Sequence, residues 1–345
     1  MPRRRSWPGV SGPKPPPEFR PLGSPAFQHY NGPVSKAPLH DDLSLPFQIE
    51  QCDVRGRLVR LGPALDRMLA RHDYPEPVAH LLAEATALVA TMASALKFDG
   101  IFSVQAKGDG PVSTLVVDFR TPGDLRGYAS FDAERLDGLE LGPGSERALV
   151  PLLLGKGYLA FTIDPQGPDM ERYQGIVDLS GATLAEAAHA YFSQSEQLNA
   201  RIVLGAAHRK GPAEARKHWR AGGILLQQLP EQAGGLSAEE RTFAWEKVTA
   251  LLGTTKSEEL TDAYLGHNEL LFRLFHEDGV RVYEAAPLQD RCTCSKDKVQ
   301  GILSTFSPDE IADMATPDGL ITVTCQFCSD SYSFPAESVQ AGGAN

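Results

Sequence analysis

Four cysteines arranged as two close pairs constrain this 345-residue chain more than any other feature. One residue separates Cys292 from Cys294, and after thirty further residues two residues separate Cys325 from Cys328. Each pair suits a tight turn that directs both sulfur atoms at one ion, as a tetrahedral four-thiolate zinc site requires. The chain has a single further cysteine, Cys52. We therefore predict that the reduced protein binds one Zn²⁺ through the four paired cysteines.

The segment that carries these cysteines has few apolar residues with which to build a core. Its predicted anchors are Ile302, Leu303, Phe306, Ile311, Met314, Leu320, Ile321 and Val323. A domain with so small a core usually needs a bound metal ion or a disulfide to stay folded, and a zinc site contributes about 10 to 16 kcal/mol to folding. A closed four-thiolate site leaves no open position for water, which favours a structural or redox-active zinc over a catalytic one, and the chain is not predicted to be an enzyme.

Oxidation of such a site would act on the whole segment. Thiolates that bind zinc can still be oxidised, and in each pair the neighbouring sulfur can resolve a sulfenic acid into a disulfide. Each disulfide removes two ligands. Because the fold of the segment depends on the metal, a change at the sulfur atoms would then unfold the whole segment, which is how a switch behaves.

The rest of the chain is predicted to be α+β, with a strand-rich N-terminal core domain, a helical linker and the small C-terminal zinc-binding domain. Ten prolines and no apolar period mark a disordered tail at the start. Pattern changes then divide the chain into a tail over 1–42, a core domain over 43–235, a linker over 236–285, a zinc redox-switch domain over 286–338 and a tail over 339–345.

Within the core domain, alternating or continuous apolar runs between turn residues predict the strands. They are "FQIEQCDVRGRLVRL", "IFSVQAKGDGPVSTLVVDF", "LRGYASF", "GYLAFTID", "YQGIVDL" and "GGILLQQLP". Helices are predicted over "GPALDRMLARH", "PEPVAHLLAEATALVATMASAL" and "TLAEAAHAYFSQSEQL". Cys52 lies in the first strand segment and is expected to be a small core side chain.

The linker shows helical apolar spacing with weak intrinsic stability. Capping boxes are predicted from Ser237 to Glu240 and from Thr255 to Glu258. Residues 231–290 carry twelve acids and five bases, a net charge of −7, so these helices need a surface to pack on. The apolar residues expected to dock on the core domain, and to control client binding, are Trp245, Val248, Leu252, Leu271, Leu274 and Phe275.

Charge and hydropathy limit the partners and the compartment. The formal charge is −11, with +5 in residues 1–40 and −16 in the remainder. A body this acidic is a poor general binder of nucleic acid, because phosphate contacts supply most of that affinity. No run of 18 apolar residues suggests a membrane span and no apolar segment follows the first arginines, so we expect a cytoplasmic protein. In a reducing cytoplasm the paired thiols are free to bind metal.

Several motifs in order resemble the thirty-three-kilodalton heat-shock protein family of redox-regulated holdase chaperones, over about residues 46–335. They are "HDYPEPV", "LKFDG", "QAKGDGP", "LRGYA", "ERYQG", "YFSQSEQL", "GGILLQQLP", "LFRLFHE", "CTC", "CQFC" and "YSF". The resemblance implies an inactive, reduced, zinc-bound form. It also implies an oxidised form with disulfides Cys292–Cys294 and Cys325–Cys328, zinc release, linker unfolding, a tendency to form a homodimer, and ATP-independent binding of unfolding client proteins under oxidative stress.

The chain differs from the family in two respects, and its cysteine pattern also suggests two alternative functions. Family members often have glycine or asparagine where this chain has Ser329, which costs about 1 kcal/mol if the position needs a positive φ, and the proline-rich tail has no counterpart. A zinc-ribbon nucleic-acid-binding protein is the main alternative, although residues 291–338 carry a net charge of −4. An oxidoreductase using Cys325 and Cys328 is the other, although such motifs normally open a helix in a βαβ unit.

Overall fold

The computed structural model describes residues 20–21, 41–139, 148–167, 171–179, 181–192, 199–210, 216–230 and 235–340. The chain divides into two compact units, Met1–Asp290 and Arg291–Asn345. The predicted tail over 1–42 lies outside the described residues except at 20–21 and 41–42, and residues 341–345 also lie outside them. The α+β class is confirmed, because the body is rich in strands, carries helices, and is followed by a C-terminal cluster of four cysteines.

The first sheet is built from strands that are far apart in the sequence. Its order is β1 (Arg20–Pro21), β11 (Val280–Val282), β2 (Leu43–Ile49), β3 (Val54–Leu61), β10 (His218–Gln228) and β9 (Ala200–Arg209), and β12 (Ala286–Pro287) also pairs with β2. Consecutive residues Ile224, Leu225 and Leu226 of β10 are all buried, so both faces of this sheet are covered. Strand β9 lies at one edge.

The second sheet is a six-stranded, largely antiparallel sheet of the same unit. Its order is β13 (Gln289–Asp290), β6 (Asp124–Phe131), β5 (Val112–Arg120), β4 (Gly100–Gly108), β7 (Gly157–Pro165) and β8 (Tyr173–Asp178). In β4, buried residues alternate with more exposed ones from Gly100 to Ala106, which is the period of a strand with one covered face. The predicted strand segments of the core domain are confirmed, with "FQIEQCDVRGRLVRL" as β2 and β3.

A long buried helix lies between the sheets and forms the main core. Helix α2 (Glu76–Ala95) contacts strands of both sheets, and nearly all of its apolar residues are buried. It is long and apolar enough to cross a membrane, but 78% of its apolar window is buried inside the fold, so it is a core helix. The same unit has shorter helices: α1 (Pro63–Leu69), α3 (Ala133–Asp137), α4 (Leu184–Tyr191) and a π-helix over Val150–Leu154.

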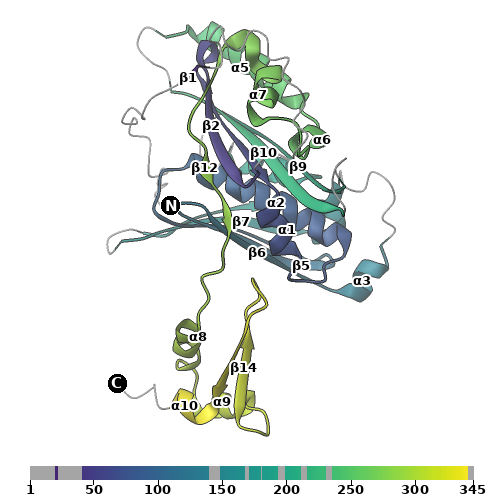
Figure 1. Ribbon diagram of the computed structural model, residues 1–345, viewed down its shortest axis with the longest axis vertical. Coiled ribbons are helices and arrows are strands. Elements are labelled where there is room, and N and C mark those ends of the chain that lie inside the picture. Colours follow the sequence, from purple (N-terminus) through teal and green to yellow (C-terminus); the bar gives the residue numbers. More distant parts are fainter. Residues whose placement is uncertain are drawn as a thin grey trace. The chain divides into compact units, whose positions relative to one another are not determined.

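The other face of the first sheet is covered by the helices predicted for the linker (Figure 1). They are α5 (Ala238–Gly253), α6 (Ser257–Leu260), α7 (His267–Phe275) and a 3₁₀ turn over His276–Asp278. The capping box from Ser237 to Glu240 is present. The one predicted at Thr255 is wrong by one residue, because α6 begins at Ser257 and the Glu259 carboxylate accepts from the N–H of Lys256.

The second unit is small and contains α8 (Lys296–Leu303), α9 (Pro308–Met314), β14 (Leu320–Thr324), β15 (Ser331–Pro335) and α10 (Ala336–Gln340). Strands β14 and β15 form an antiparallel hairpin. Its buried core is Leu303, Ile311, Ile321, Phe334 and Val339. Four predicted anchors are wrong, because Ile302, Phe306, Met314 and Leu320 are exposed on the surface of these short helices and strands. This unit therefore has an even smaller apolar core than its sequence suggested.

Two local predictions in the first unit also need correction. Cys52 is buried, as expected, but it ends a 3₁₀ turn (Glu50–Cys52) between β2 and β3 and does not lie in a strand. The turn reverses the chain because Asp53 adopts a positive φ of 49°. Strand β9 was not predicted at all.

Candidate functional site

The four paired cysteines form one cluster in the second unit. Their sulfur atoms all lie within 4.8 Å of one another, and every cysteine in the chain is a free thiol. The Sγ atoms of Cys292 and Cys325 are 3.8 Å apart, and those of Cys294 and Cys328 are 3.2 Å apart. Sulfurs held about 2.3 Å from one ion at tetrahedral angles would be about 3.8 Å apart. The cluster therefore has the size of a four-thiolate metal site.

Short local structures place each pair of sulfur atoms. Cys292 and Cys294 precede α8, whose first turn is capped by the Ser295 side chain accepting from the N–H of Lys298 at 3.3 Å. Cys325 and Cys328 lie in the loop between β14 and β15, which the Cys325 carbonyl closes by accepting from the N–H of Ser329 at 2.9 Å. The second pair thus lies in a hairpin loop and does not open a helix, unlike the pair of a thiol oxidoreductase.

The electrostatics of the cluster suit a divalent cation. Burial raises the pKa of Cys292, but hydrogen bonds from the Cys294 N–H and the neighbouring thiols outweigh it and bring this pKa below its ordinary value. Burial raises the pKa values of Cys294 and Cys328. One thiolate therefore opposes ionisation of its neighbours, and a bound cation would relieve that repulsion. The residues present fit a zinc ion.

Two residues, Tyr332 and Ser329, lie next to the cluster and affect one of its sulfur atoms or the loop that carries it. The Tyr332 hydroxyl lies 3.2 Å from the Cys294 sulfur, a contact that the sequence did not predict, although Tyr332 begins the "YSF" motif. Ser329 has a φ of +60°, so the position after the last cysteine does need the left-handed conformation that glycine adopts most easily. The conditional cost predicted for serine at this position therefore applies.

The six residues predicted to dock the linker lie in the first unit, apart from the cysteine cluster in the chain. Val248, Leu252, Leu271 and Phe275 are buried, and Trp245 and Leu274 pack half-buried against the same apolar cluster. That cluster includes a sheet surface, here called the linker-facing surface, formed by Leu45, Phe47, Leu58, Ile224 and Leu226. The Phe47 and Phe275 rings stack with centroids 6.1 Å apart.

A buried arginine that the sequence did not suggest also holds the linker. Arg60 of β3 is 1% exposed, and its guanidinium donates hydrogen bonds to three main-chain carbonyls of the linker. Nη1 donates to Asp262 and Leu265 at 2.8 and 2.7 Å, and Nη2 donates to Glu259. Sequence patterns pointed instead to apolar residues, because a lone arginine in a strand gives no sign that its partner lies about 200 residues away.

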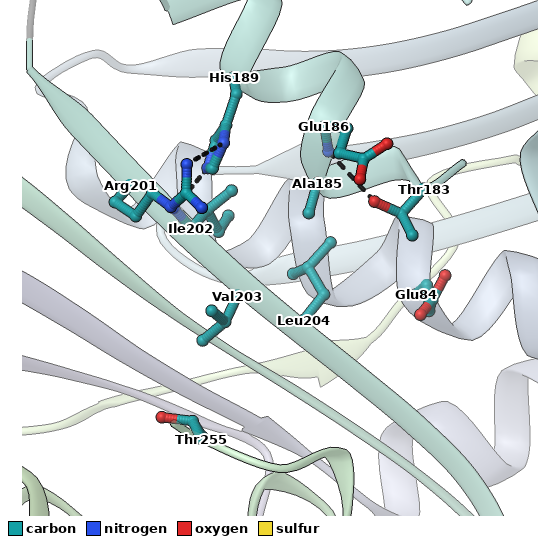
Figure 2. A pocket seen from close by; sticks show the side chains of 10 residues that line it. All are labelled: Glu84, Thr183, Ala185, Glu186, His189, Arg201, Ile202, Val203, Leu204 and Thr255. Atoms are coloured by element: carbon teal, nitrogen blue, oxygen red, sulfur yellow. Dashed lines mark hydrogen bonds between the residues drawn. The ribbon is translucent and has the colours of Figure 1, made fainter. Parts of the chain in front are cut away.

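A cavity of about 490 Å³ lies beside the edge strand β9. Figure 2 shows its lining, which comes from α2, α4, β9 and Thr255. Its polar groups serve the fold: His189 accepts from the N–H of Ile202 at 2.9 Å, and Thr183 caps α4. Glu84 lies 3.9 Å from His80, and burial raises the pKa of Glu84 to about 7. None of the predicted site residues lines this cavity.

Together, these features define a protein with an α+β body of two sheets, an apolar sheet surface covered by helices of its own chain, and a separate thiol cluster fit for a metal ion. The chain belongs to the Hsp33 protein family, because the model of that family matches residues 42–335.

Named relatives agree with this assignment. A 33 kDa chaperonin of Caulobacter vibrioides is 48% identical over 295 residues, which cover 85% of this chain and 94% of the relative. A 33 kDa chaperonin of Azotobacter vinelandii is 39% identical over 310 residues, covering 88% and 96%. In fold, the chain is similar to a crystal structure of a 33 kDa chaperonin, a heat shock protein 33 homolog, from Thermotoga maritima. That similarity has a TM-score of 0.70 at 21% identity and covers 88% of this chain and 97% of the other.

Proposed function

We propose that this protein is a redox-regulated holdase chaperone of the cytoplasm, inactive while reduced and zinc-bound and activated when its four paired cysteines are oxidised. One observation carries the proposal: four free thiols lie within 4.8 Å of one another in a unit with only a small apolar core. The chaperonin relatives support the chaperone activity.

In the resting state, Cys292, Cys294, Cys325 and Cys328 act as metal ligands. Bound Zn²⁺ would supply the positive charge that keeps all four thiolates ionised together. The cysteines would then cross-link the segment before α8 to the β14–β15 loop. This link, worth about 10 to 16 kcal/mol, would dominate the stability of a unit with so few buried side chains.

Oxidation would remove these ligands in two steps, through a sulfenic acid and then a disulfide. A cysteine thiolate attacks hydrogen peroxide, takes one oxygen to become a sulfenic acid, and releases hydroxide. The neighbouring thiol then displaces the hydroxyl group, forming a disulfide and releasing water. Following the family, the pairs would be Cys292 with Cys294 and Cys325 with Cys328. Two disulfides leave no thiolate to bind the ion, and the second unit would unfold.

Unfolding of the second unit would release the linker helices. The linker is acidic, and its docking would be only a few kcal/mol stable, enough to cover the sheet in the reduced form. Its departure would expose Leu45, Phe47, Leu58, Ile224 and Leu226. We propose that this linker-facing surface, with the linker's own apolar residues, holds unfolding client proteins without ATP, in a form that tends to dimerise.

Cys52 has no part in this switch. It is buried, and burial together with the nearby Asp278 carboxylate raises its pKa to about 11, so it stays a protonated and unreactive thiol.

The test measures zinc content and suppression of client aggregation before and after peroxide treatment. The reduced protein should contain one zinc and be inactive, and the oxidised protein should have lost zinc and be active. Changing the four paired cysteines to serine should abolish zinc binding, whereas Cys52→Ser should leave both states unchanged. Full zinc retention after oxidation, or activity without any thiol chemistry, would refute the proposal.

A further inference from the structure

Three residues on neighbouring strands form a seat for main chain on the first sheet. Arg60 of β3 is opposite Gly222 of β10, and Gly222 is opposite Gly205 of β9, so the three lie in one row across the sheet. We call this row the backbone seat. Helix α6 lies over it, because a Cβ added at Gly205 would meet Ser257 atoms at 2.7 to 3.2 Å. At Gly222 an added Cβ would lie 3.0 Å from the Leu260 carbonyl oxygen.

The two glycines let the linker approach the sheet closely, although a Cβ at Gly222 would also meet the Val59 carbonyl oxygen of β3 at 2.9 Å. The atoms nearest to an added Cβ at Gly205 all belong to Ser257, so the missing side chain makes room for the linker and for nothing else in the sheet. The Ser257 hydroxyl also donates to the Ala206 carbonyl at 3.4 Å. The floor of the seat therefore admits a closely packed segment, with the Ser257 hydroxyl and Cα over Gly205 and the Leu260 carbonyl over Gly222.

Arg60 recognises that main chain without reading its sequence. Its three acceptors, the carbonyls of Glu259, Asp262 and Leu265, belong to the end of α6 and the turn that follows. Carbonyls at the end of a helix have no partner within the helix, and a guanidinium can satisfy several of them at once. The hydrogen-bond acceptors are all main-chain oxygens, and the Asp262 carboxylate adds an electrostatic attraction for the guanidinium. A segment that presents a similar set of carbonyls would therefore fit.

When the linker undocks, Arg60, Gly205 and Gly222 stay in place on the sheet, but the linker main chain no longer covers them. Without the linker, water replaces the three carbonyls as acceptors for the Arg60 guanidinium, and the carbonyls of another segment can displace that water. In the next row of the same face, Leu58, Ile224 and Val203 lie side by side and offer an apolar strip for a neighbouring side chain. A partly unfolded polypeptide offers both kinds of partner that the surface loses when the linker is released: main-chain carbonyls for Arg60 and apolar side chains for the strip.

We propose that the backbone seat formed by Arg60, Gly205 and Gly222 is a client-binding site, where main-chain carbonyls of an unfolding polypeptide replace those of the linker. This inference rests on the proposed holdase function and specifies its site. It explains how one surface accepts clients of unrelated sequence, since the recognised groups are present in every polypeptide.

The test compares variants of the full-length, oxidised protein, in which the linker is detached in every case. The probe is a permanently unfolded protein, reduced and carboxymethylated α-lactalbumin, and the measurement is its Kd. Arg60→Met should weaken binding about tenfold by removing three charge-assisted hydrogen bonds. Gly205→Val should weaken it several-fold by filling the floor, without touching Arg60. Arg55→Met is the matched control, because Arg55 lies on the opposite face of β3 and is exposed.

Three outcomes distinguish a failure of the proposed client-binding site from a failure of the proposed holdase function. If Arg60→Met and Gly205→Val weaken binding while Arg55→Met stays within about twofold of wild type, the seat is a client site. If both seat variants are folded by circular dichroism and bind the probe as tightly as wild type, the seat only holds the linker and the inference is wrong. If oxidised wild type does not bind the probe, the proposed function itself fails.

Discussion

Leu271→Ala tests whether the linker helices control activity. Leu271 of α7 is fully buried in the cluster that includes Phe47 and Leu58. Removing a buried leucine side chain costs about 3 kcal/mol, and each 1.4 kcal/mol is a factor of ten, so the docked-to-undocked ratio should fall about 100-fold. A linker held by only a few kcal/mol would then be undocked in a large fraction of molecules. We therefore expect the reduced, zinc-bound variant to show chaperone activity.

Two measurements on the reduced protein check this prediction. Hydrogen exchange over residues 238–275 should be faster in Leu271→Ala, and the variant should suppress aggregation of a thermally unfolding client while it retains zinc. Phe243→Ala is the matched control, because Phe243 belongs to α5 and is 71% exposed, so its loss should change neither. An open linker with no gain of activity would show that linker release does not expose the client site. Unchanged exchange would show that docking is far stronger than we infer.

Three further predictions concern single side chains. Ser329→Gly should stabilise the zinc-bound second unit by up to about 1 kcal/mol by relieving a positive φ, measured as tighter zinc retention against a chelator; equal or weaker retention would contradict this. Glu84 has a folded pKa of about 7 against 4.5 in the unfolded chain, so its burial cost is complete above pH 7 and vanishes below about pH 4.5. Glu84→Gln should therefore raise the free energy of unfolding by about 3 kcal/mol at pH 8 in urea titrations, with little gain at pH 4.5, and a gain independent of pH would refute this cause. Tyr332→Phe should speed peroxide-induced zinc release about threefold or more, because the Cys294 thiolate loses a hydrogen bond that lowers its nucleophilicity. Tyr283→Phe is the control, because its hydroxyl donates to Gln48 of β2, and it should release zinc at the wild-type rate.

The cluster of four thiols was predictable from sequence because its cysteines are rare and closely paired. Two pairs of a rare residue at short spacing allow few interpretations, and the sulfurs do gather within 4.8 Å. Element types were also predictable where alternation was clear, as in β4, or where a long apolar run followed a proline, as in α2. The apolar residues of α5 and α7 followed from helical spacing, and their burial is seen at Val248 and Leu271. Their roles in docking and client binding remain predictions.

The missed features depend on contacts between distant segments. Strand β9 has glycine and alanines in place of a clear alternation, and it forms because β10 pairs with it over ten residues. The partners of Arg60 lie about 200 residues along the chain, so its role is invisible to local patterns. The core of the second unit was overestimated because helical spacing alone cannot tell whether a helix has a neighbour: Ile302 and Met314 fit the pattern and still face solvent.

The contact between Arg60 and the linker also bears on how this protein can evolve. Because the guanidinium binds carbonyl oxygens, its hydrogen bonds do not depend on the side chains of residues 259–265, of which Leu260, Thr261, Ala263 and Leu265 are buried. Mutations at the less buried acidic positions, Glu259 and Asp262, can change the acidity of the linker, and with it the ease of release, while the hydrogen bonds stay in place. Lineages exposed to different levels of oxidant could thus adjust the threshold of the switch through surface substitutions in a short segment, without redesigning the sheet on which it rests.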